Sequence, residues 1–171
     1  MSRALIPVLL AVVLDLVGFG IVIPLLTFYA EEYQAGPVEV TLLMAVYSLA
    51  QFVMVPVWCA MSDRIGRLPV MLLSLAMATV CLAGFAWADT LVMLFVFRTL
   101  HGAAAANIST AQACVADLTT PENRAKGMGL IGAAFGFGFT VGPFIGGELS
   151  VYGYAVPIWA AAGLAAFNLV L

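Results

Sequence analysis

The chain carries very little charge. Only 9% of its 171 residues are Asp, Glu, Lys or Arg, and it has a single histidine. A soluble domain has about 25% charged residues, so this chain lacks the polar surface that would keep it in water. It also shows no nucleophile–base pair, no phosphate-binding loop and no basic patch. We therefore expect neither an enzyme nor a nucleic-acid-binding protein.

Cysteine is scarce, and no signal-peptide cleavage site is visible. The three cysteines lack metal-ligand spacing and lie in or beside apolar segments, which indicates buried thiols (Cys59, Cys81 and Cys114). The apolar N-terminal run continues to about Phe28 without an A-x-A-like site, and Asp15 interrupts it. We interpret this run as a retained membrane span.

Long hydrophobic runs are what the chain does contain, since 64% of its residues are hydrophobic. A helix needs about 20 apolar residues to cross a bilayer. Six such runs predict an all-α membrane protein with one six-helix transmembrane domain over residues 1–171, with spans near 5–28, 40–60, 70–88, 91–115, 127–147 and 154–171.

The placement of charge predicts the orientation of these spans. Five of the six basic residues fall at the N-terminus and in the second-to-third and fourth-to-fifth loops (Arg3, Arg64, Arg67, Arg124 and Lys126). The intervening loops hold no lysine or arginine, and their charged residues are all acidic (Glu31, Glu32, Glu39, Asp89 and Glu148). By the positive-inside rule, both termini are then cytoplasmic. Because the sequence stops within an apolar segment at Leu171, we expect it to be the first half of a larger protein.

Two ionisable residues lie near the middle of predicted spans, Asp15 in the first and Arg98 in the fourth. A charge at the centre of a membrane helix costs about 2.5–3.5 kcal/mol on insertion scales, so such residues usually serve a function. One interpretation is a carboxylate that takes up and releases a proton during transport. The alternative is a permanent Asp15–Arg98 ion pair that only locks two helices together.

Polar and small residues form a stripe on the fourth span. At 100° per residue, five positions fall within about 60° of Arg98 on an ideal helix (His101, Gly102, Ala105, Ser109 and Gln112). The second span adds Tyr47 and Gln51 at i, i+4 spacing. We expect Tyr47, Gln51, Ser109 and Gln112 to line a substrate cavity. His101 is a candidate for proton coupling beside Arg98, with hydrogen-bonded packing as its alternative role.

Glycines clear one face of the fifth span, where Gly138, Gly142 and Gly146 repeat every four residues. Such spacing lets another helix backbone approach closely. Pro143 removes a backbone hydrogen bond and favours a kink.

Four elements together resemble the major facilitator superfamily, and within it the drug:proton antiporters that include the tetracycline efflux proteins. The second-to-third loop matches G-x-x-x-D-R-x-G-R-R at Asp63, Arg64, Gly66 and Arg67, although Cys59 and Leu68 depart from it. Arg98 to Gly102 is similar to a fourth-span R-x-x-x-G element. The run ending in Gly142, Pro143, Gly146 and Gly147 is similar to the antiporter element G-x-x-x-G-P-x-x-G-G. The segment from Asp15 to Gly20 resembles the first span of the tetracycline-type exporters.

This resemblance implies two inverted three-helix repeats, about 1–88 and 89–171, forming half of a twelve-span transporter. It implies that Asp63 and its arginines form a cytoplasmic latch and that Arg98 takes part in proton transfer. We expect a proton-coupled antiporter of the bacterial inner membrane that exports small amphipathic compounds, driven by the proton gradient without a cofactor. Its partners would be lipid, substrate and a second six-helix half, either a C-terminal domain or another copy of the chain.

Two alternatives remain from the sequence. A non-transporting membrane module would keep the fold without the transport cycle, and the lock interpretation of Asp15 and Arg98 favours it. A proton-coupled importer of the same fold is disfavoured by the antiporter-type fifth span.

Overall fold

A computed structural model describes residues 5–171, which form seven helices and no strand. The helices are α1 (Leu5–Glu31), α2 (Pro37–Ile65), α3 (Arg67–Ala86), α4 (Leu91–Ala104), α5 (Asn107–Leu118), α6 (Pro121–Ser150) and α7 (Ala155–Val170). Arg3, which contributed to the orientation argument, lies outside the described residues. The predicted all-α class is confirmed.

The helices account for the predicted spans. Five segments are long and apolar enough to cross a membrane when α4 and α5 are taken together, and α7 is an apolar helix of 16 residues. Most helices extend past the predicted spans by about a turn, and the longest extensions are those of α2 to Ile65 and of α6 from Pro121. Their extra turns carry polar residues, so these helices continue beyond the apolar stretch instead of ending with it.

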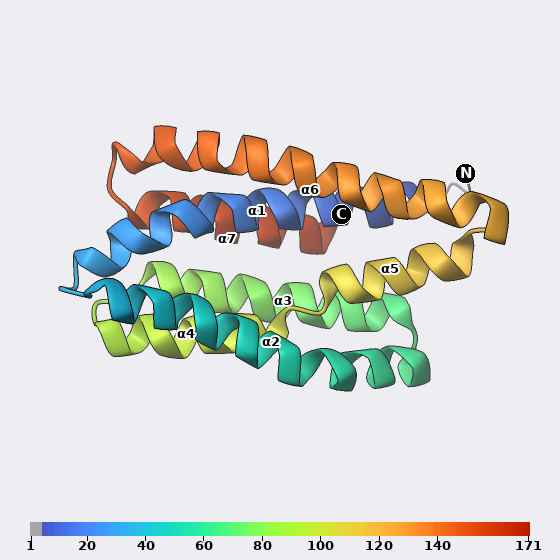
Figure 1. Ribbon diagram of the computed structural model, residues 1–171, viewed down its shortest axis with the longest axis horizontal. Helices are drawn as coiled ribbons and strands as arrows, with labels where there is room; N and C mark the ends of the chain where they lie inside the picture. Colours follow the sequence, from blue (N-terminus) through green and yellow to red (C-terminus); the bar gives the residue numbers. More distant parts are fainter. Residues whose placement is uncertain (1–4) are drawn as a thin grey trace.

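The helices run along one long axis and successive spans alternate in direction, with α4 and α5 continuing one another in the same direction (Figure 1). The α2–α3 and α5–α6 connections lie at the same end of the bundle as the start of α1. The α1–α2, α3–α4 and α6–α7 connections lie at the opposite end. The basic loops are therefore gathered at one end and the acidic loops at the other.

The helices pack as two three-helix repeats that interlock, one made of α1, α2 and α3 and the other of α4 with α5, α6 and α7. The first helix of one triplet packs against the middle helix of the other, so α1 contacts α6 and α4 contacts α2. Likewise α1 contacts α7 while α4 contacts α3, and the two third helices, α3 and α7, contact each other. Because each triplet has an odd number of spans, the two triplets cross the bilayer in opposite directions, as inverted repeats do.

Glycines let α1 and α6 cross at backbone distance. A Cβ atom added at Gly142 would lie 2.6 Å from the backbone of Gly20, and one at Gly138 would lie 2.7 Å from Leu16. A Cβ at Gly146 would lie 3.0 Å from the Ile21 carbonyl oxygen. The predicted small-residue face of the fifth span is thus the contact face with α1, where close approach replaces the hydrophobic effect as a source of association.

The fourth span differs from its prediction as one continuous helix over 91–115. Helix α4 ends at Ala104 and α5 begins at Asn107, with Ala105 and Ala106 outside either helix. Figure 1 shows the interruption near the middle of the bundle. Since the helical register is lost there, the stripe drawn through Arg98, Ser109 and Gln112 does not continue as one face.

Side chains from two other helices satisfy the backbone at this break. Trp58 Nε1 donates to the Ala103 carbonyl oxygen at 2.6 Å. The Ser74 hydroxyl donates to the Ala104 carbonyl oxygen at 2.6 Å and accepts from the Ala106 N–H at 3.1 Å. Unpaired backbone groups are costly in a bilayer, so these bonds from α2 and α3 stabilise the interruption.

Substituting Gly142 by alanine tests the α1–α6 crossing. The added methyl meets the Gly20 backbone, which cannot move aside as a flexible side chain would, so we expect a loss of about 1–3 kcal/mol in stability. Gly136→Ala on the same helix is the control, because an added Cβ there meets nothing within 4 Å. Thermal unfolding in detergent should show a lowered midpoint for Gly142→Ala only. Equal midpoints for both variants would contradict the crossing.

Removing the Ser74 hydroxyl tests the break. Ser74→Ala removes the Ser74 bonds to the Ala104 carbonyl and the Ala106 N–H, which then keep only their bond to each other at 2.8 Å. The expected cost is about 0.5–1.5 kcal/mol for each bond lost. The control is Ser48→Ala, since the exposed Ser48 hydroxyl bonds only to Met44 one turn earlier on its own helix. Hydrogen exchange of the amides after Ala104 should accelerate in Ser74→Ala and not in the control. Unchanged exchange would show that the break does not depend on Ser74.

Candidate functional site

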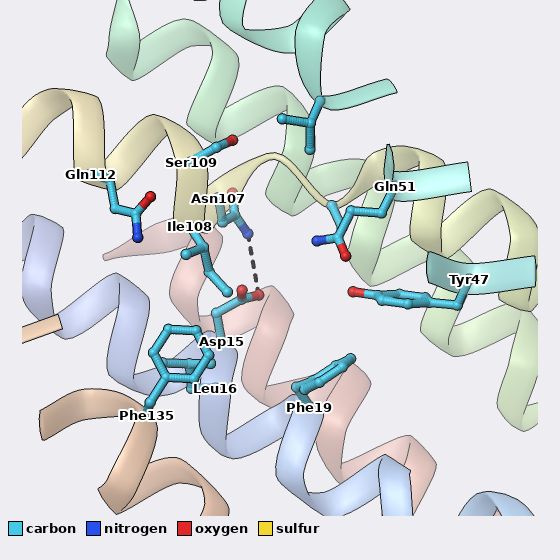
Figure 2. Close-up of a pocket in the computed structure, with 12 residues that line it drawn as sticks. Asp15, Leu16, Phe19, Tyr47, Gln51, Asn107, Ile108, Ser109, Gln112 and Phe135 are labelled. Atoms are coloured by element: carbon cyan, nitrogen blue, oxygen red, sulfur yellow. Dashed lines mark hydrogen bonds between the residues drawn. The ribbon is translucent and has the colours of Figure 1, made fainter. Parts of the chain in front are cut away.

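Asp15 lies half-buried in the middle of α1 and has a hydrogen-bond donor from across the bundle. Asn107 Nδ2 donates to Asp15 Oδ1 at 3.2 Å (Figure 2). Asn107 is the first residue of α5, so the break in the fourth span sets the position of this amide. The residue is only 6% exposed, and its Oδ1 has no hydrogen-bond partner among the described residues.

A cavity of about 320 Å³ opens in front of Asp15. All four residues that were predicted to face a substrate line it (Tyr47, Gln51, Ser109 and Gln112). The rings of Phe19 and Phe135 also line it. Figure 2 shows the polar groups of α2 and α5 on one side and Phe135 of α6 on the other. Among the described residues the lining includes one carboxylate and no lysine, arginine or histidine. Such a lining suits an amphipathic molecule with an apolar face and hydrogen-bond donors.

Arg98 does not pair with Asp15. The ion pairs that residues 5–171 form both involve Arg67, so the Asp15–Arg98 lock is absent from this structure. Arg98 instead stacks on Tyr47, with its guanidinium carbon 4.4 Å from the ring centroid. The correction has a simple cause, because a helical wheel shows the direction of a side chain within its own helix and not which neighbour it meets.

The Arg98 guanidinium is almost completely buried, with 3% of the residue exposed. Its Nε and Nη1 atoms have no hydrogen-bond partner among the described residues. A cation–π contact of this kind contributes about 0.5–2 kcal/mol, which offsets only part of the cost of burying a charge. His101, one turn later on α4, is also buried and meets the Tyr47 ring edge-on at 5.4 Å between centroids.

Gly102 explains how α4 comes so close to α2. A Cβ atom at this position would overlap the backbone of Tyr47. Both ends of the R-x-x-x-G element therefore contact Tyr47. Gly102 lies against its backbone, and the Arg98 guanidinium stacks on its ring. Proton coupling by Asp15, Arg98 and His101 stays a prediction at this point, but the structure places Asp15 on one side of Tyr47 and Arg98 and His101 against its ring.

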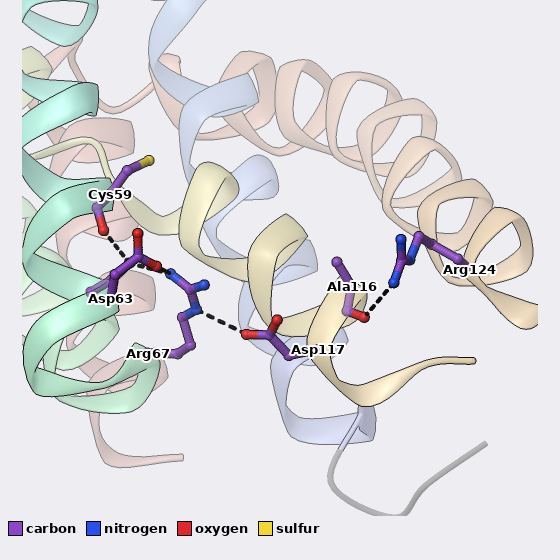
Figure 3. A network of polar contacts seen from close by, with 7 residues as sticks. Cys59, Asp63, Arg67, Ala116, Asp117 and Arg124 are labelled. Carbon is purple, nitrogen blue, oxygen red and sulfur yellow. Dashed lines mark hydrogen bonds and ion pairs between the residues drawn. The ribbon is translucent and has the colours of Figure 1, made fainter. Parts of the chain in front are cut away.

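A second polar cluster lies at the end of the bundle that holds the basic loops (Figure 3). Arg67 Nη1 contacts Asp63 Oδ1 at 2.6 Å, and Arg67 Nε contacts Asp117 Oδ2 at 3.1 Å. Arg67 thus bridges the end of α2 to the end of α5. Arg64 is exposed and takes part in neither ion pair, and Gly66 turns the chain between α2 and α3 with φ of +101°. Of the four predicted latch residues, Asp63 and Arg67 therefore form an ion pair and Gly66 makes the turn between their two helices, whereas Arg64 takes no part.

The sequence analysis missed three residues of these sites. Asn107 was hidden within an alanine-rich run, Ser74 is an isolated hydroxyl on an apolar helix, and Asp117 was not assigned a partner. The signal for Asp117 was available, because it is an acid at the end of the fourth span that lies near the basic second-to-third loop. No group of three His, Cys, Asp or Glu side chains in residues 5–171 could hold a metal ion.

Comparison with known proteins gives a consistent result. The family model of the Major Facilitator Superfamily matches residues 8–171. The class C tetracycline resistance protein of Escherichia coli is 39% identical over 173 residues, which cover 99% of this chain and 44% of that protein. Major facilitator superfamily domain-containing protein 10 of Bos taurus is 34% identical over 177 residues, which cover 86% of this chain and 39% of that protein.

A solved structure shares the fold. The crystal structure of the human organic anion transporter MFSD10 (TETRAN) matches with a TM-score of 0.87 and 29% identity, over 98% of this chain and 46% of that one. The chain spans less than half the length of these relatives. The match over nearly every residue, together with the observed helix packing, shows that this chain belongs to the major facilitator superfamily.

Proposed function

We propose that the chain acts as one six-helix half of a proton-coupled antiporter that exports small amphipathic compounds. The observation that carries this proposal is the Asp15 carboxyl group, which lines a cavity inside the bundle and has a hydrogen-bond donor in Asn107. A carboxylate at this depth is costly unless its charge is used, and exchange of a proton for a substrate uses it.

Antiport follows if Asp15 cannot serve a proton and a substrate at once. A substrate that donates a hydrogen bond or presents positive charge to the cavity favours the carboxylate, and the proton is then released. Reprotonation removes that attraction and favours release of the substrate on the other side. Arg98 and His101, against the Tyr47 ring, place positive charge and a second titratable group close to the same wall of the cavity.

The substrate class follows from the lining and the relatives. Aromatic rings with carboxamides and a hydroxyl fit planar or polycyclic compounds that carry several polar groups. Several relatives are tetracycline resistance proteins, so tetracycline-like compounds are the first substrates to test. The proton gradient is the proposed energy source, no cofactor is required, and the proposed location is the bacterial inner membrane with both ends of the domain cytoplasmic.

In this proposal the Asp63–Arg67–Asp117 cluster is the cytoplasmic latch. It joins α2, α3 and α5 at one end, and its exposed ion pairs are individually weak, so it can open during a transport cycle. The glycine face of α6, with Gly147 left open on the opposite side, keeps α1 and α6 moving together.

Replacing Asp15 by asparagine tests the coupling. The amide keeps the size of the side chain but cannot carry a proton, so proton-driven efflux should fall roughly tenfold or more while substrate exchange without a gradient persists. Uptake of a tetracycline or a fluorescent dye into everted vesicles measures both modes.

The matched control is Asp89→Asn, in the exposed loop before α4. It should transport as the unchanged chain does. Full proton-driven efflux by Asp15→Asn, with equal expression, would refute the role of Asp15.

A six-helix half needs a partner in order to enclose a substrate. Both ends of the domain face the same side, so two halves can lie in parallel about an axis normal to the membrane, as the halves of such transporters do. The proposed partner is a C-terminal domain or another copy of this chain. Native mass spectrometry of transport-active preparations should therefore show assemblies of at least twelve spans. Transport-active monomers of six spans would contradict this expectation.

The non-transporting alternative loses its main support in this structure. It relied on a permanent Asp15–Arg98 lock, whereas Asp15 faces a cavity and Arg98 stacks on Tyr47. An importer is not proposed, because α6 carries the antiporter-type glycine face.

A further inference from the structure

A small compartment lies next to the main cavity, on the side of Asp15 that faces the bundle interior. Its volume is about 30 Å³, and its wall shares five residues with the main cavity (Asp15, Phe19, Tyr47, Ala105 and Asn107). A buried water needs about 10–15 Å³, so the compartment has room for about two water molecules.

The polar groups of this compartment are the kind that hold water. Asn107 Oδ1 belongs to a residue that is 6% exposed, and it lacks a hydrogen-bond partner among the described residues. Asp15 and His101 also line the compartment. A buried water typically makes about three hydrogen bonds, and these three side chains can supply them. The lining from α3 and α7 is apolar (Ala78, Leu82, Ala161 and Ala165).

Asp15 needs a partner in each of its two charge states. As a carboxylate it accepts from Asn107 Nδ2. As a carboxylic acid it must donate its O–H, and an amide nitrogen cannot accept that bond. An unpartnered polar group inside the bundle is costly, so the protonated state requires an acceptor nearby.

We propose that the compartment binds water, held by Asn107 Oδ1 between Asp15 and His101, which gives Asp15 a hydrogen-bond partner in both charge states. When Asp15 is a carboxylate, the water donates one bond to it and one to Asn107 Oδ1, and a neutral His101 N–H donates to the water. When Asp15 is protonated, the water accepts its O–H and still donates to Asn107 Oδ1. The water turns while the side chains stay in place.

The charged and titratable groups around Asp15 fit this arrangement. Tyr47 comes from α2, and Arg98 and His101 come from α4, with the Arg98 guanidinium carbon 4.4 Å from the Tyr47 ring centroid. The Tyr47 and Phe19 rings lie 5.4 Å apart and stand at the boundary between the compartment and the main cavity. Water in the compartment therefore lies next to the substrate cavity but is held by protein side chains and not by the substrate.

Gly18→Ala adds a methyl group at the wall of the compartment and leaves its polar side chains unchanged. Gly18 lines the compartment, and an added Cβ would meet only the Ala161 carbonyl oxygen at 3.9 Å, an ordinary contact. The variant should therefore fold. Gly163→Ala in α7 is the matched control, because its added Cβ meets nothing within 4 Å and it lies outside the compartment. Asn107→Leu, of similar size, removes the water acceptor instead.

The first measurement is infrared difference spectroscopy of the full chain in lipid, between high and low pH, in ordinary and in heavy-oxygen water. The unchanged chain should show an O–H stretching band that shifts with the isotope, and Asp15→Asn should lose it. Gly18→Ala and Asn107→Leu should also lose this band, and Gly163→Ala should keep it. A band that survives in Gly18→Ala, or that is missing from the unchanged chain, would overturn the water site.

The second measurement is transport, and here the inference rests on the proposed function. Gly18→Ala should lower proton-driven efflux roughly tenfold while leaving gradient-free substrate exchange intact, since only the change in Asp15 charge is hindered. An equal loss of both modes, or no loss, would contradict the coupling role of the water. If no assembly of the unchanged chain transports, the proposed function fails, and the infrared result still decides the water site.

Discussion

The need to satisfy the backbone polar groups from within the bundle governs this structure, because lipid offers no hydrogen bonds in return. This is most visible at the break in the fourth span, where the carbonyl oxygens of Ala103 and Ala104 accept hydrogen bonds from Trp58 and Ser74. The break then places Asn107 where its amide reaches Asp15. The buried carboxyl group therefore depends on bonds made by two helices, α2 and α3, that supply no direct hydrogen bond to it.

Helix α5 links the two polar clusters of the molecule. Its first residue, Asn107, bonds to Asp15 beside the cavity, and Asp117 near its other end bonds to Arg67 in the Asp63–Arg67–Asp117 cluster. The helix has 12 residues and so is about 18 Å long. Since the break frees α5 from α4, a displacement of α5 along its axis would change both contacts at once. The geometry thus connects the carboxyl group in the membrane to the ion pairs at the surface.

Close helix contacts provide the rigid part of the bundle. Glycines of α6 lie against the α1 backbone, and Gly102 of α4 lies against the Tyr47 backbone of α2. These two crossings are related by the exchange of the repeats, since each joins the first helix of one triplet to the middle helix of the other. The Arg98–Tyr47 stack occurs at the second crossing, so the buried cation is held by a helix contact and not by a counter-ion.

The sequence by itself determined the membrane class, the spans, their alternating direction and the family, because apolar length, charge placement and motif spacing are local properties of the chain. It also placed Tyr47, Gln51, Ser109 and Gln112 on one cavity. Only the tertiary structure decided the break at Ala105, since the run Ala103–Ala106 has the highest helix propensity in this part of the chain and one preceding glycine, Gly102, does not specify an interruption. The same holds for the partners of Arg98 and Asp15. Helical periodicity gives the direction of a side chain, whereas its partner depends on which other helix packs there and at what height.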